Sequence, residues 1–202
     1  MARPLVAAAL IALGVALGII LAVATPEPNE QSSIEWLDSP RSLDSFSLQS
    51  AAGPFDGQSL LGRWTIILFG FLNCPDICPT SMAEFARLAD SLQSTPVNHA
   101  VGFVFISIAP GRDSVSAVSE YAQHFSPALL GVGGASEQLQ QLAGDLGMAF
   151  KVAADEDSYT VTHPAIFSIV DPNGRLRGRF RPGFDRPELT RNLVAKVAVT
   201  DH

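Results

Sequence analysis

Hydrophobic and polar positions along the chain predict strands that alternate with helices from about residue 43 onward. Two nearly continuous apolar runs, at 64–72 and 101–108, are typical of strands buried on both faces of a sheet. Apolar residues at helical spacing predict helices over 80–92, 114–125, 137–146 and 187–197, with a shorter strand at 129–132. This order predicts an α/β domain in which helices cover a central sheet.

Two hairpins are expected, one near each end of this domain. Polar and apolar residues alternate over 45–48 and run into the turn Ala51-Ala52-Gly53-Pro54, which predicts an N-terminal hairpin. Strands at 165–170 and 176–180 flank Asp171-Pro172-Asn173-Gly174, a sequence typical of tight turns. With the closing helix, this pattern predicts a thioredoxin-like fold that has a central mixed sheet flanked by helices.

Residues 5–24 form an apolar run without a charge, which as a helix would span about 30 Å, the thickness of a bilayer core. Arg3 precedes the run, and the positive-inside rule then places the domain outside the cytoplasm. Ala22-Val23-Ala24 is similar to a signal-peptide cleavage site, but the run is longer than the usual signal core. We therefore expect 1–24 to be a single N-terminal transmembrane anchor or signal segment, with the domain in the periplasm at the cell inner membrane.

Residues 25–42 are rich in proline and polar residues and are expected to be a linker, which leaves 43–202 as the folded domain. The 202 residues include 13 Lys and Arg and 20 Asp and Glu, so the net charge of -7 argues against a nucleic-acid partner. A hydrophobic share of 47% excludes a disordered chain. Two cysteines are too few for a scaffold held together by disulfides.

Both cysteines, Cys74 and Cys78, lie in the hexapeptide CPDICP, directly after a buried strand and at the start of a helix. Amide groups and the dipole at a helix N-terminus stabilise thiolates. Two thiolates aimed at one point form a disulfide or bind a soft metal ion. A disulfide closing so short a loop stabilises little, and three intervening residues differ from the two of the usual redox motif. A catalytic redox pair and a metal site therefore both stay open.

His163 has the most informative setting of the four histidines. It follows Tyr159-Thr160-Val161-Thr162 and precedes the strand expected at 165–170. In a thioredoxin-like sheet, the loop that enters this strand lies beside the helix that carries the cysteines. Two thiolates and one imidazole suit both oxidation states of copper. The other histidines are expected to be surface residues: His99, His124 and His202.

Taken together, these residues resemble the Sco/SenC family of copper proteins. The resemblance covers most of the chain after the linker and is carried by 69–73 leading into CPDICP, by 107–113, by Tyr159-x-Val161-x-His163 and by Asp171-Pro172-x-Gly174. It implies a membrane-tethered thioredoxin-like domain that binds copper, as Cu(I) and Cu(II), through Cys74, Cys78 and His163. One departure is Ala109, which stands where the family often has an acid, while Arg112 and Asp113 remain.

The function implied by this resemblance is that of a metallochaperone. Such a protein takes copper from an upstream donor and helps assemble the binuclear copper centre in subunit II of cytochrome c oxidase, or serves another copper-requiring oxidase. The alternative is a thiol-disulfide oxidoreductase, in which Cys74 and Cys78 are the redox pair that reduces the recipient's cysteines or senses redox state. A peroxidase is disfavoured because Phe71 and Ile67 replace the Thr or Ser and the Pro that peroxiredoxins place before the attacking cysteine.

Two further patterns have an ordinary and a functional interpretation. Met82 lies four residues after Cys78 on an apolar helix face and is expected in the core rather than as a copper ligand. Arginines alternate from 175 to 181, so on a strand they share one face, and this favours a solvated face with neighbouring acids over a docking stripe for an acidic partner. These are Arg175, Arg177, Arg179 and Arg181.

Overall fold

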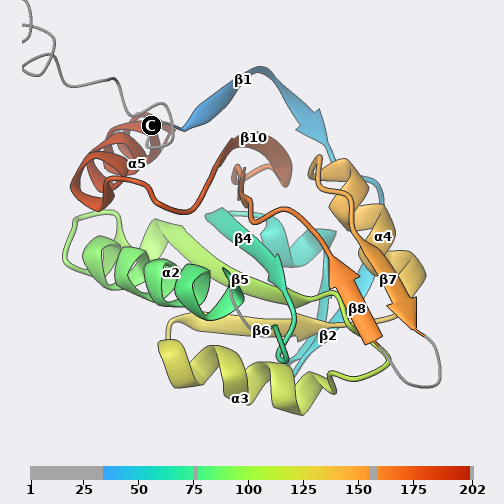
Figure 1. The fold of residues 1–202 in the computed structure, drawn as a ribbon. Coiled ribbons are helices and arrows are strands. Elements are labelled where there is room, and N and C mark those ends of the chain that lie inside the picture. The colour runs from blue at the N-terminus through green and yellow to red at the C-terminus, as the bar shows by residue number, and fades with distance from the viewer. Residues whose placement is uncertain (1–33, 75–76, 155–158, 201–202) are drawn as a thin grey trace, which may run out of the picture. The chain divides into compact units, whose positions relative to one another are not determined.

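A computed structural model describes residues 34–74, 77–154 and 159–200, and Figure 1 shows helices packed around a twisted central sheet. The main sheet has eight strands in the order β1-β10-β9-β4-β5-β6-β2-β3. The strands of this sheet are β1 (Glu35–Ser42), β2 (Ser47–Ser50), β3 (Gly53–Asp56), β4 (Trp64–Gly70), β5 (Val101–Ser107), β6 (Leu129–Gly133), β9 (Phe167–Val170) and β10 (Arg175–Phe180). The helices are α2 (Ile77–Gln93), α3 (Val115–Phe125), α4 (Ser136–Asp145) and α5 (Arg186–Thr200), with short 3-10 turns η1 (Gly57–Leu60) and η2 (Asn98–Ala100).

Parallel and antiparallel pairs meet at the centre of the sheet. β4 pairs with β5 in parallel from Trp64↔Val101 to Gly70↔Ser107, and β5 pairs in parallel with β6. β9 runs antiparallel to β4 on its other side, with Leu68 opposite Phe167. The expected mixed sheet flanked by helices is therefore confirmed, and this is the arrangement of a thioredoxin-like domain.

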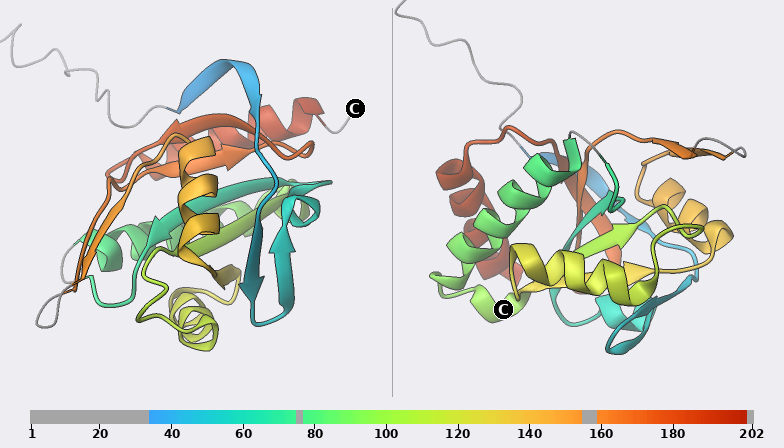
Figure 2. Two further views of the ribbon diagram at one scale, coloured as in Figure 1. Left: turned by 90° about the vertical axis from the view of Figure 1, so that its right-hand side faces the viewer. Right: turned by 60° about the horizontal axis from the view of Figure 1, so that its bottom comes forward.

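The two faces of the sheet are covered by different elements, as the two views in Figure 2 show. Ile66 and Leu68 of β4 pack in a core cluster with residues of α2, α3 and α5. Ile67 and Phe69, which point to the opposite face, pack in a second cluster with residues of α4 and the β2–β3 hairpin. Every residue of β4 and β5 is buried, which explains why both strands appear in the sequence as apolar runs.

The sheet extends into the stretch that was expected to be a linker. Residues 35–42 of that stretch instead form β1, an edge strand whose Glu35 lies opposite Arg179 of β10. Trp36 packs edge-on against Trp64, with 6.3 Å between the ring centroids. Pro40 is compatible with this position because an edge strand does not require every backbone N–H for pairing. The predicted anchor at 1–24 lies outside the described residues, and among the described helices none is long and apolar enough to cross a bilayer.

A second, two-stranded sheet precedes the candidate histidine. β7 (Lys151–Ala154) pairs antiparallel with β8 (Tyr159–Thr162), with Lys151 opposite Thr162. Val152 and Val161 are partly buried against the core cluster on the α4 side of the main sheet. The expected N-terminal hairpin is confirmed as β2–β3, whereas the sequence did not predict the β7–β8 hairpin.

Candidate metal centre

The cysteine segment connects a central strand to the first described helix. β4 ends at Gly70, Phe71 to Cys74 follow, and α2 begins at Ile77, so Cys78 belongs to the first turn of that helix. Cys74 is half-buried, and the side chain of Cys78 lies outside the part that the structure describes. The sequence-predicted position of the pair, after a buried strand and at the opening of a helix, is confirmed.

His163 lies between β8 and β9 and is half-buried. Its Nδ1 is 3.1 Å from the carbonyl oxygen of Pro164. Because a carbonyl can only accept, Nδ1 carries the proton, which leaves the lone pair of the neutral ring on Nε2. Burial lowers the pKa of His163 below its ordinary value of 6.5, and the hydrogen bond to Pro164 opposes that shift. The neutral ring, the form that binds metals, is thus favoured.

One open cleft brings the cysteine segment and the histidine together. Its volume is about 550 Å³, and Phe71, Asn73 and Cys74 line it together with the stretch 159–163. The ring of Phe71 meets that of His163 edge-on, with centroids 6.0 Å apart. The loop that enters β9 therefore lies beside the cysteine segment, as the thioredoxin-like topology predicts.

The donor set of the cleft includes one described thiol and one imidazole. Among the described side chains, no three His, Cys, Asp or Glu residues are grouped closely enough to bind a metal ion. The predicted third donor is Cys78, which belongs to the helix that starts three residues after Cys74. The chemistry of the donor types, thiolate and imidazole, suits a soft metal such as copper.

Ser81 and Met82 of α2 lie next to His163 but differ in their contacts. His163 also lines a narrow crevice with Ser81, Met82 and Ala165. Met82 is completely buried in the core cluster on the α2 face, as expected for a packing residue. The hydroxyl of Ser81 is buried and makes no hydrogen bond within the described part of the chain.

The turn after β5 contacts the cysteine segment, a role that sequence reasoning missed. Asp113, 7% exposed, accepts a hydrogen bond from the Leu72 amide at 3.0 Å. Ala109, at the position where the resemblance leads one to expect an acid, is buried. Its carbonyl accepts hydrogen bonds from the amides of Arg112 and Asp113. The stretch 107–113 was noted as a motif, but its link to Leu72 depends on contacts between distant parts of the chain.

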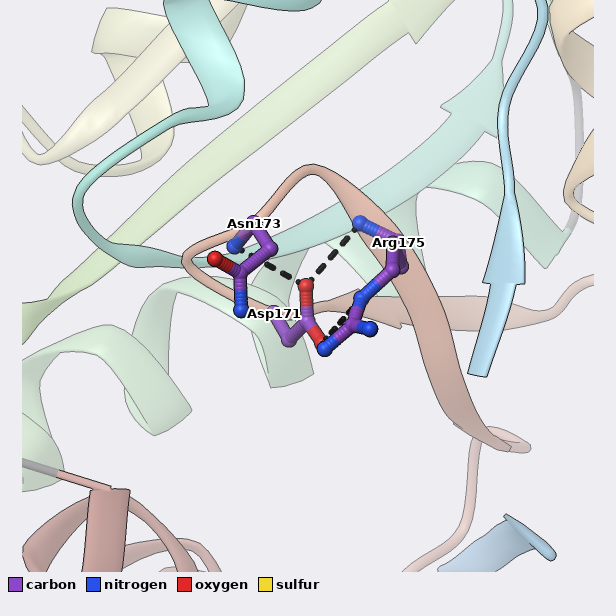
Figure 3. A network of polar contacts seen from close by, with 3 residues as sticks. All are labelled: Asp171, Asn173 and Arg175. Carbon is purple, nitrogen blue, oxygen red and sulfur yellow. Dashed lines mark hydrogen bonds and ion pairs between the residues drawn. The ribbon is translucent and has the colours of Figure 1, made fainter. Parts of the chain in front are cut away.

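Arg175 and Arg179 of β10 have acidic partners. Arg175 forms an ion pair with Asp171 at 2.8 Å, as Figure 3 shows. Arg179 pairs with Glu35 of β1 at 3.2 Å. These contacts favour the interpretation of a solvated face over that of a docking stripe.

Comparison with known proteins gives a consistent assignment. The SCO1/SenC family model matches residues 37–198. A putative copper-binding protein of Stutzerimonas stutzeri is 37% identical over 141 residues, 69% of this chain and 69% of that protein. The human mitochondrial SCO1 homolog is 32% identical over 139 residues, 68% of this chain, so the match spans less than half (46%) of the human protein.

Solved structures share the fold at similar coverage. The crystal structure of Arabidopsis thaliana ScoI with copper bound has a TM-score of 0.69 at 32% identity and covers 77% of this chain and 97% of that one. Yeast Sco1 with copper bound has a TM-score of 0.70 at 28% identity, covering 79% of this chain and 90% of that one. With the match of the family model over most of its length, the chain belongs to the SCO1/SenC family.

Proposed function

We propose that this protein binds copper through Cys74, Cys78 and His163 and delivers it during assembly of cytochrome c oxidase. The observation that carries the proposal is the shared cleft, in which Cys74 and His163 lie on facing segments that are far apart in the sequence. Family membership supports it, because relatives include a protein named as copper-binding and structures solved with copper bound.

The chemistry of the three side chains fits both oxidation states of the metal. Thiolates of Cys74 and Cys78 would hold Cu(I), and the imidazole of His163 would support Cu(II) as a nitrogen ligand. His163 is favoured in its neutral form because burial lowers its pKa. Its Nδ1 hydrogen bond to Pro164 fixes the ring orientation in the way that outer contacts usually orient metal-binding histidines.

Delivery requires that a recipient reach the metal. The cleft is open and its lining includes the half-buried Cys74, so thiolates of a partner could approach from that side. Copper would then pass by ligand exchange, with each incoming thiolate replacing one ligand of this site. We propose subunit II of cytochrome c oxidase as the recipient, an upstream copper donor, and the segment 1–24 as a membrane anchor that keeps the domain in the periplasm.

A second candidate function uses the same cysteines without the metal. Cys74 lines the open cleft, and the pair brackets the start of α2, where the helix amides and dipole stabilise a thiolate. Cys74 and Cys78 could then reduce a disulfide in the recipient, becoming oxidised to a disulfide themselves. This function does not need His163, which separates it from copper binding.

The test is a titration of the reduced full-length chain, in detergent, with Cu(I) and with Cu(II). The proposal predicts one equivalent of each and, for Cu(II), an absorption band from sulfur-to-copper charge transfer. His163→Ala should weaken Cu(II) binding sharply and leave a reducible cysteine pair, while His99→Ala, an exposed histidine on η2, serves as the matched control. Preference for zinc over copper contradicts the proposal. Disulfide reductase activity that is retained in His163→Ala, in a chain that binds neither Cu(I) nor Cu(II), favours the second function instead.

A further inference from the structure

We propose that Arg112 and Asp113 are positioning residues that hold the two halves of the copper site together. Asp113 fixes the cysteine segment, and Arg112 fixes the hairpin that leads to His163. Both belong to the turn Gly111-Arg112-Asp113 between β5 and α3, which we call the bridging turn. The inference deepens the proposed function and rests on it, because the site it describes is the copper site.

Asp113 connects the bridging turn to the chain that enters the cysteine loop. Its Oδ2 accepts hydrogen bonds from the Leu72 amide at 3.0 Å and from the Ser107 hydroxyl at 2.6 Å. The Ser107 oxygen in turn accepts from the Ala109 amide at 3.2 Å. Because the carboxylate is buried, these charge-assisted bonds are shielded from water and fix Leu72, two residues before Cys74.

Arg112 connects the same turn to the hairpin. Its guanidinium carbon lies 5.0 Å from the centroid of the Tyr159 ring, within the range of a cation–π contact. Tyr159 opens β8 and, like His163 four residues later, lines the cleft. A side chain on Gly111 would lie 3.7 Å from Cε2 of the ring, so Tyr159 packs directly over the turn.

The electrostatics of Tyr159 agree with this placement. Burial and then the negative charge of Asp113 raise the pKa of Tyr159 above its ordinary value of 10.0. A backbone hydrogen bond with Gly111 and the charge of Arg112 oppose the shift. All three residues of the bridging turn therefore act on this one ring.

The hairpin depends on such contacts because it is separate from the main sheet. β7 and β8 pair only with each other among the described strands, so ladder hydrogen bonds do not fix them to the eight-stranded sheet. An isolated two-stranded hairpin is at best marginally stable in water. Val152 and Val161 pack against the core on the α4 side, and the Arg112–Tyr159 contact fixes the end of β8 at which the strand begins.

The first test compares copper binding by full-length variants in detergent. Arg112→Ala should weaken Cu(II) binding about fivefold, since an exposed cation–π contact is worth up to about 1 kcal/mol, and should reduce the charge-transfer band. Arg112→Lys should restore much of the affinity, because ammonium also binds an aromatic face. Cu(I) affinity should change less than twofold, because two thiolates remain. The matched control is Arg87→Ala, which removes an exposed arginine on α2.

Substitution of Asp113 should change the two copper affinities in a different way. Asp113→Asn removes the charge while keeping the shape, and it should weaken Cu(I) and Cu(II) by similar factors because the cysteine segment serves both. The inference is overturned if Arg112→Ala binds Cu(II) like the wild type, or if it weakens Cu(I) and Cu(II) equally. Failure of the wild type to bind copper overturns the proposed function, and this inference with it.

A second measurement needs no copper, so it tests the positioning role separately from the proposed copper binding. Amide hydrogen exchange of the metal-free protein should accelerate in the described residues of β7 and β8 in Arg112→Ala, and at Leu72 in Asp113→Asn. Arg87→Ala should leave both regions unchanged. Unchanged exchange in the Arg112 and Asp113 variants overturns the positioning role even where the wild type binds copper.

Discussion

The turn between β9 and β10 offers a quantitative test of how the sheet around the site is stabilised. Asp171, 3% exposed, accepts hydrogen bonds through both carboxylate oxygens (Figure 3). Oδ1 accepts from the amides of Asn173 and Arg175, each at 3.0 Å. Oδ2 accepts from Nε and Nη2 of Arg175 at 3.1 and 2.8 Å. The perturbation is Asp171→Ala, which removes all four bonds.

The two hydrogen bonds from backbone amides account for most of the stability that Asp171→Ala should lose. A hydrogen bond contributes about 1 kcal/mol net, so leaving two amides without their acceptor costs about 2 kcal/mol or slightly more. The Arg175 side chain is 41% exposed, so its ion pair adds only about 0.5 kcal/mol after screening by solvent. We expect Asp171→Ala to lower the free energy of unfolding by about 2–3 kcal/mol. In a domain of this size that corresponds to a Tm lower by about 5–10 °C.

The assay is urea unfolding followed by circular dichroism, with thermal unfolding as a check. Asp171→Asn keeps one acceptor oxygen for the amides and should lose only about 1 kcal/mol. Arg175→Ala removes the ion pair alone and should lose about 0.5 kcal/mol or less. The reasoning is refuted if Asp171→Ala is no less stable than Arg175→Ala, because the backbone bonds would then contribute nothing measurable.

Three further predictions concern packing, a buried hydroxyl and a tyrosine. A Cβ on Gly131 would lie 2.5 Å from the Val118 carbonyl oxygen, so Gly131→Ala should force α3 from β6 and cost about 3 kcal/mol or more in urea unfolding; Gly144→Ala, in open space on α4, should be neutral or stabilising by up to about 1 kcal/mol. Ser81→Ala should leave the free energy of unfolding unchanged within about 0.5 kcal/mol, since its buried hydroxyl makes no hydrogen bond in the described part of the chain, and a larger loss would contradict this. Tyr159 should ionise above pH 10.0 in an absorbance titration carried out in the Tyr121→Phe background, and Asp113→Asn should move that pKa downward because a charge opposing ionisation is removed; an upward move contradicts the geometry.

Those parts of the fold that are buried on both faces could be predicted from the sequence. β4 and β5 are apolar at nearly every position because helices or loops cover both faces of the sheet, and the helices show the spacing of a single buried stripe. The β9–β10 hairpin has its own local signal in Asp171-Pro172-Asn173-Gly174, whose Gly174 adopts a φ of +71°. In these elements the local sequence pattern and the burial in the fold both favour the same structure, so the prediction succeeded.

Strands that depend on distant partners could not be predicted in the same way. β1 contains Pro40 and polar residues, a composition that predicts a linker. The strand forms because β1 pairs with β10, where Glu35 lies opposite Arg179, 144 residues further along the chain. β7 and β8 are four residues each, too short for a periodic signal to stand out. Their formation is decided by packing against the domain rather than by local pattern.

In the candidate site too, some residues could be predicted from the sequence and others depend on contacts between distant parts of the chain. Cys74, Cys78 and His163 could be singled out because thiols and imidazoles are rare in this chain and have informative neighbours. Asp113 could be noted as part of the 107–113 motif, but its contact could not be predicted, since its partner Leu72 lies 41 residues earlier and contributes only a backbone amide. The groups that bind can thus be inferred from residue chemistry, whereas the groups that position them emerge only from the folded arrangement.

X-ray absorption on the Cu(I)-loaded and Cu(II)-loaded full-length chain tests the central claim most directly, because it identifies the atoms bound to copper. The account predicts two sulfur ligands in both states and a histidine nitrogen that disappears in His163→Ala but persists in His99→Ala. A copper bound without sulfur, or a nitrogen signal in His163→Ala equal to that of the wild type, would contradict the proposed set of Cys74, Cys78 and His163.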